Sequence, residues 1–139
     1  MSSATVSTLP PGHETLAAAL VSGLAAARRA RPAQHVRIPA APKPSSHDAV
    51  DAWTATHAGA LAVRGWLCVS QAGDTVRFAA HSLVRAADGK LLDPTFLPTD
   101  PVLPFVPHPR QVGGFFAHLC MRDAPHELVV LGVPDEGPQ

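Results

Sequence analysis

Apolar residues recur at four-residue spacing in the first third of the chain. One face of the predicted element carries Leu16, Leu20, Leu24 and, beside them, Val21. This spacing is typical of an amphipathic helix and predicts one over residues 13–30 that packs on the rest of the domain. Arg28 and Arg29 lie near its C-terminal end, where positive charge complements the helix dipole, and Pro32 ends it.

A second helix is predicted to begin abruptly after a proline-rich connector over residues 39–44. Ser45, Ser46 and Asp48 all favour a helix N-terminus, and Ser45 and Asp48 have the spacing of a capping box. The residues that can share its buried face are Ala49, Val50, Trp53 and His57. Gly59 closes the helix. Before the connector, residues 34–38 could form a short strand.

Strand patterns follow the second helix. Residues 62–70 predict a strand, residues 71–75 turn the chain, and residues 76–96 predict a β-hairpin. The strand-forming residues of this hairpin are Val76, Phe78, Val84, Leu91 and Leu92. The hairpin carries His81 on one strand and Asp93 on the other. Its register therefore decides whether these two side chains share a face of the sheet.

Two turns would give opposite registers. A two-residue turn at Asp88-Gly89 would pair Val84 with Asp93 and would place Asp93 on the face opposite to His81. A three-residue loop over residues 87–89, with Gly89 in the left-handed region, would instead pair Leu83 with Asp93. The two polar side chains would then be diagonal neighbours within reach of a hydrogen bond. Glycine in third place suits the three-residue loop, because only glycine adopts that conformation without strain.

The C-terminal half is rich in proline. Residues 94–110 contain too many prolines for regular structure but are too apolar for a free linker, so we expect an extended strap laid over the core. Residues 112–121 suit a short helix, and residues 127–132 a last strand. The fold class expected is α+β, with N-terminal helices packed on a small antiparallel sheet. One domain is expected over residues 13–134, between tails at residues 1–12 and 135–139.

Charge and cysteine content narrow the functional classes. The chain has 11 lysines and arginines against 11 aspartates and glutamates, so it lacks the basic field of a nucleic-acid-binding protein. Its two cysteines, Cys68 and Cys120, are too few for a disulfide framework or a multi-cysteine zinc site. No apolar run has the length of a membrane span, and the N-terminus lacks the features of a signal peptide. A cytoplasmic location is expected, with secretion by a signal-independent route left open.

Three residues carry a resemblance to a known family. Ser46 lies at a helix N-terminus, His81 on a following strand, and Asp93 on the next strand in the sequence Asp-Pro-Thr. This order resembles the papain-like fold, and most closely its transglutaminase-like branch, over residues 45–96. In that branch the first position holds the nucleophilic cysteine. Here it holds serine.

The resemblance implies an amide-directed hydrolase, deamidase or acyl transferase that acts on a peptide or protein. Ser46 would be the nucleophile, His81 the general base and Asp93 the residue that orients the imidazole. Backbone N–H groups around Ser46 and His47 would stabilise the oxyanion, and Gln34 could add an amide donor. Serine in place of cysteine leaves three accounts open: an active serine enzyme, a member that has lost its chemistry, or a native cysteine replaced by serine to inactivate the protein.

The same residues allow other interpretations. A non-catalytic module of the same architecture would bind a peptide or partner protein in the cleft, and small size alone would suit a secreted bacterial effector or toxin. Ser46 could simply cap the helix, His81 could bond to a backbone carbonyl, and Asp93 before Pro94 is a common turn arrangement. His47, His57 and His81 lack metal-ligand spacing, so no metal or other cofactor is expected.

Overall fold

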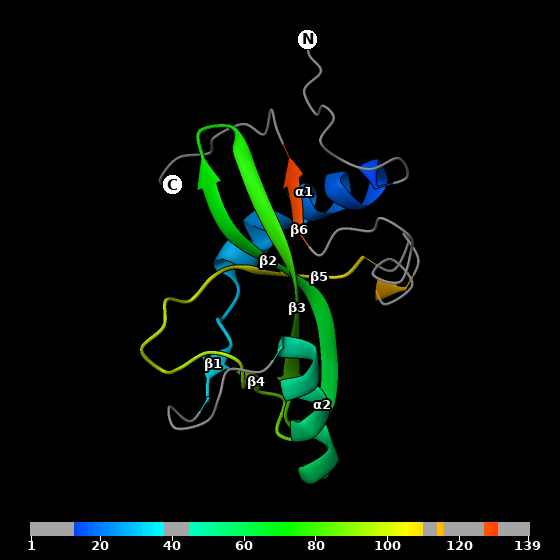
Figure 1. Ribbon diagram of the computed structural model, residues 1–139, viewed down its shortest axis with the longest axis vertical. Helices are drawn as coiled ribbons and strands as arrows, with labels where there is room; N and C mark the ends of the chain where they lie inside the picture. Colours follow the sequence, from blue (N-terminus) through cyan, green and yellow to red (C-terminus); the bar gives the residue numbers. More distant parts are fainter. Residues whose placement is uncertain (1–12, 38–44, 110–113, 116–126, 131–139) are drawn as a thin grey trace.

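A computed structural model describes residues 13–37, 45–109, 114–115 and 127–130 of the chain (Figure 1). The elements in chain order are the helix α1 (Glu14–Arg29), the strand β1 (Gln34–His35), the helix α2 (Ser46–Thr56), and the strands β2 (Leu61–Ala72), β3 (Thr75–Arg85), β4 (Leu91–Asp93), β5 (Phe105–Pro107) and β6 (Glu127–Val130). The predicted α+β class is confirmed. The sheet is mixed rather than antiparallel, because β1 pairs with β4 in parallel.

The long hairpin of β2 and β3 forms the centre of the sheet. Its strands join through a two-residue turn, Gly73-Asp74, with Gly73 at a φ of +60°, so the turn is shorter than the predicted 71–75. A bulge between Cys68 and Ser70 adds one residue to β2. β5 pairs with the other edge of β2, while β4 and β6 pair with different stretches of the free edge of β3 (Figure 1).

The turn between β3 and β4 has the three-residue form. Arg85 pairs with Leu91, and the Ala86 N–H donates to the Lys90 carbonyl at 2.8 Å. Within the loop, the Gly89 N–H donates to the Ala86 carbonyl at 2.8 Å, and Gly89 has a φ of +89°. This conformation strains any residue with a Cβ, so glycine at position 89 permits the three-residue loop. The register that places Leu83 opposite Asp93 follows from it.

Side-chain alternation gives the central hairpin two faces. The first, which we call the helix face, packs on both helices. Its main apolar cluster joins the leucine stripe of α1 to the sheet and contains Leu16, Leu20, Leu24, Trp66, Phe78, Val106 and Leu128. Val50 of α2 is also fully buried. The opposite side, the cavity face, carries Val63, Leu67, His81 and Leu83. This side borders a space lined by the strap, by small residues of α1 and by His35 of β1.

The strap departs in part from its prediction. Residues 97–104 are irregular, but residues 105–107 form β5, in which Val106 pairs with Trp66 and Pro107 with Gly65. Proline is tolerated in β5 because this strand lies at the end of the strand order, where an N–H can be spared. The predicted helix over residues 112–121 lies almost wholly outside the described residues. The predicted last strand is present as β6.

We expect Gly65→Ala to separate β5 from β2. A Cβ at position 65 would lie 2.6 Å from Phe105 Cζ and 3.0 Å from Pro107 Cα, so the strap would have to move. The free energy of unfolding should fall by about 3 kcal/mol, as for other overpacked sites. Gly73→Ala is the matched control, because a Cβ there would contact nothing within 4 Å and only the positive φ would be strained.

The control should cost about 1 kcal/mol. Urea unfolding of both variants measures the difference. Equal losses would show that β5 does not depend on close approach at Gly65.

Candidate functional site

His81 and Asp93 meet on the cavity face of the sheet. His81 Nε2 lies 2.7 Å from Asp93 Oδ2, and the two residues are only 5% and 2% exposed. The bond joins diagonal neighbours across β3 and β4, as the three-residue loop predicts. The hydrogen bond predicted from the register is therefore confirmed.

The carboxylate and the ring are both held in place. Asp93 Oδ1 accepts a hydrogen bond from the Thr95 N–H at 2.9 Å, so each carboxylate oxygen has a partner. The ring of Phe96 stacks on His81 at a centroid distance of 5.4 Å and also contacts His35 at 5.2 Å. With Nε2–H donated to Asp93, a neutral His81 carries its lone pair on Nδ1. Nδ1 is then the nitrogen that could accept a proton.

Ser46 lies at the edge of β3. Its hydroxyl oxygen accepts a hydrogen bond from the Ser82 N–H at 3.2 Å. This N–H lies between the stretches of β3 that pair with β4 and β6, so no described strand reaches it. The helix cap is Ser45, whose hydroxyl accepts from the Asp48 N–H at 3.1 Å, and the capping interpretation of Ser46 is wrong. Among the described residues, no hydrogen bond joins Ser46 to His81.

His47 points to the other side of the strand from His81. Its Nδ1 lies 2.6 Å from Ser82 Oγ, which also accepts a bond from Arg64 at 2.8 Å. Ser82 Oγ can donate its hydrogen to His47 Nδ1 or accept a second hydrogen bond from it, according to the tautomer of the imidazole. Arg64 also pairs with Asp51 of α2 at 2.9 Å. This network ties α2 to the helix face. The oxyanion role of the backbone N–H groups around Ser46 and His47 stays a prediction.

The remaining candidates lie apart from this arrangement. Gln34 is exposed on β1, level with Leu92, and its predicted role is not tested by any contact. The three histidines of the possible metal site contact different residues: His57 stacks on Trp53 at a centroid distance of 4.2 Å, His47 bonds to Ser82, and His81 bonds to Asp93. Within the described ranges, no three His, Cys, Asp or Glu side chains are grouped to hold a metal ion.

The thiol of Cys68 is buried and unreactive. Burial raises the pKa of its thiol, and the nearby Arg28 guanidinium only partly opposes this effect. At neutral pH the thiol therefore stays protonated and is a poor nucleophile. This fits the interpretation of Cys68 as a core residue.

Sequence reasoning missed four residues that complete the site. Phe96 stacks on His81 and also contacts His35, and both lie at the cavity face. Ser82 and Arg64 form hydrogen bonds on the helix face. The alternation of β3 places Ser82 opposite to His81, and this signal was readable in the sequence. The contacts of His35 were not, because they depend on the parallel pairing of β1 with β4, far away in sequence.

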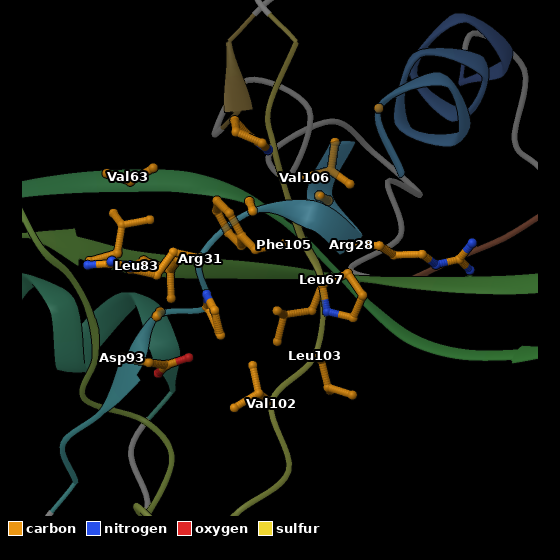
Figure 2. Close-up of a pocket in the computed structure, with 18 of the residues that line it drawn as sticks. Arg28, Arg31, Val63, Leu67, Leu83, Asp93, Val102, Leu103, Phe105 and Val106 are labelled. Carbon is orange, nitrogen blue, oxygen red and sulfur yellow. The ribbon is translucent and has the colours of Figure 1, made fainter. Parts of the chain in front are cut away.

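A cavity of about 690 Å³ opens beside the His81–Asp93 pair. Asp93 and Phe96, which both contact His81, are part of its wall, and Leu67, Leu83 and Phe105 line its apolar part (Figure 2). The volume lies in the usual range for ligand sites. The pair is thus buried from bulk solvent but adjacent to a space that a ligand could enter.

Comparisons with known proteins do not assign this arrangement to a family: no protein-family model, curated protein or solved structure matches the chain. None of the described helices is long and apolar enough to cross a membrane.

Replacing the buried carboxylate tests how firmly the pair is held. Asp93→Asn keeps the shape and the acceptor for Thr95 but forces the His81 ring to change its tautomer or lose the bond. We expect the free energy of unfolding to fall by about 2 kcal/mol. Urea denaturation measures it.

The control for this prediction is Glu127→Gln, the same chemical change in a pair with Arg77 whose side chains are about half exposed. It should cost less than about 0.5 kcal/mol, because solvent screens the pair. A loss at Asp93 no larger than at Glu127 would contradict a tightly held buried pair.

Proposed function

We propose that the protein is an amide-directed hydrolase, deamidase or acyl transferase of the papain-like kind, acting on a peptide or protein. One observation carries the proposal. The Ser46 hydroxyl accepts a hydrogen bond from the N–H of Ser82, the residue directly after His81, while His81 is held by Asp93 beside a cavity. The Ser46 hydroxyl thus binds the strand backbone one residue away from the histidine that Asp93 holds.

The bond at Ser46 suits a nucleophile. An N–H that donates to the hydroxyl oxygen leaves the hydroxyl hydrogen available to a base, and it stabilises negative charge that develops on the oxygen. His81 Nδ1 is the ring nitrogen that Asp93 leaves for a proton. In the proposed reaction Ser46 Oγ attacks the substrate carbonyl and Nδ1 takes its proton, while Asp93 keeps the ring oriented.

The first turn of α2 supplies the oxyanion donors in this scheme. Helix N-termini present N–H groups that the helix does not satisfy, and α2 begins at Ser46. The backbone N–H of His47 is one candidate. The tetrahedral intermediate would collapse with proton transfer from His81 to the leaving group, which yields an acyl-enzyme that water or an amine then resolves.

A binding module without chemistry is the second candidate. It is favoured by the absence, among the described residues, of a hydrogen bond between Ser46 and His81 in the free protein. The strap also contributes Val102, Leu103 and Phe105 to the cavity wall, which makes that wall apolar. In this case the peptide or partner protein would bind in the cleft and stay intact.

Ser46→Cys separates the two candidates. A thiol next to an imidazole at a helix N-terminus ionises more readily than a free thiol, whose pKa is about 8.5. We expect iodoacetamide to label Cys at position 46 rapidly at pH 7, with an apparent thiol pKa at least about one unit below the free value. Adding His81→Ala should return the pH profile to that of an ordinary thiol.

Ser45→Cys is the matched control, because it lies one residue away and is exposed at the cap of the same helix. Its pH profile should be ordinary and indifferent to His81. The unsubstituted chain gives the background of Cys68 and Cys120. Identical profiles at positions 45 and 46, or a position-46 profile that ignores His81, would remove the enzymatic candidate and leave the binding module.

A further inference from the structure

The cavity wall carries more positively charged side chains than negatively charged ones. Its charged lining residues are Arg28, Arg31, Arg85 and Asp93. Both oxygens of Asp93 are already bonded, to His81 and to the Thr95 N–H. Asp93 lies on one side of the apolar side chains and Arg28 on the other (Figure 2). The wall therefore carries positive charge in excess, and Arg28 contributes to it on the side away from Asp93.

The interior between these charges is apolar and roomy. Leu67 and Leu83 come from the sheet and Leu103 and Phe105 from the strap, and their side chains converge on one space (Figure 2). The α1 side of the wall is made of small residues such as Ala26 and Ala27. Small side chains on α1 leave open the volume that larger ones would fill. The result is a cavity of about 690 Å³ rather than a packed core.

Two polar side chains of the wall, those of His35 and Asp93, are already hydrogen-bonded. His35 Nδ1 is engaged by the Leu97 carbonyl at 3.1 Å, and Asp93 is engaged as described. A buried peptide needs partners for each of its N–H and C=O groups. An aliphatic chain needs none, and its burial is favourable in proportion to its apolar area.

We propose that the cavity binds an aliphatic carboxylate, with the chain among the leucines and phenylalanine and the carboxylate at the arginines of the rim. Arg31 and Arg85 are both exposed, so they can bind the anionic head without losing contact with water. The inference does not rest on catalysis at Ser46. The site would hold such a ligand whether or not the protein carries out a reaction.

Titration calorimetry with decanoate, below the concentration at which it forms micelles, tests the site. We expect saturable binding of one decanoate per chain to the unsubstituted protein. Ala26→Trp should weaken it by about tenfold or more, because the indole would occupy the cavity from the exposed side of α1. Ala18→Trp, also exposed on α1 but outside the cavity wall, should bind as the unsubstituted protein does.

The charge of the ligand is tested separately. Arg31→Glu should weaken decanoate binding by about three- to tenfold, whereas Arg29→Glu, exposed on α1 and outside the wall, should have little effect. Decyltrimethylammonium, with the same chain and opposite charge, should bind more weakly than decanoate. Equal binding of the two amphiphiles, equal effects of the two tryptophan variants, or no saturable binding of decanoate would each overturn the proposal.

Discussion

The register between β3 and β4 is the constraint on which the site depends. Gly89 at a φ of +89° permits the three-residue loop, and that loop places Leu83 opposite Asp93. A slip of one residue would turn every side chain of β4 to the other face. Asp93 would then leave His81 for the helix face, and both its hydrogen bonds and the wall of the cavity would be lost. One backbone conformation thus decides the chemistry of two side chains that lie twelve residues apart.

Strand β3 directs the side chains of two consecutive polar residues, His81 and Ser82, to opposite faces of the sheet. His81 and Asp93 bond on the cavity face, while Ser82, His47 and Arg64 bond on the helix face. The second network fixes α2 against the sheet and so positions Ser46 at the strand edge between the two faces. On the other face, the His81–Asp93 pair lies beside the cavity.

The cavity is a consequence of what covers the sheet. The helix face is closed by two helices, whose apolar side chains interlock with those of the strands. The cavity face is covered by a strap in which prolines remove hydrogen-bond donors and prevent a continuous strand. Only residues 105–107 pair with β2. The irregular remainder of the strap and the small residues of α1 leave unfilled volume, and that volume adjoins Asp93.

Local features of the chain were determined by the sequence itself. The leucine stripe specified α1, Ser45 and Asp48 specified the start of α2, and Gly89 favoured the turn that brings His81 to Asp93. These predictions depend on periodicity and on backbone preferences within a few residues. The tertiary structure decided the rest: the parallel pairing of β1, the short strand β5, the partner of Ser46, and the cavity. Each of these joins segments that are distant in sequence, and their contacts depend on the shape of surfaces that exist only after the chain has folded.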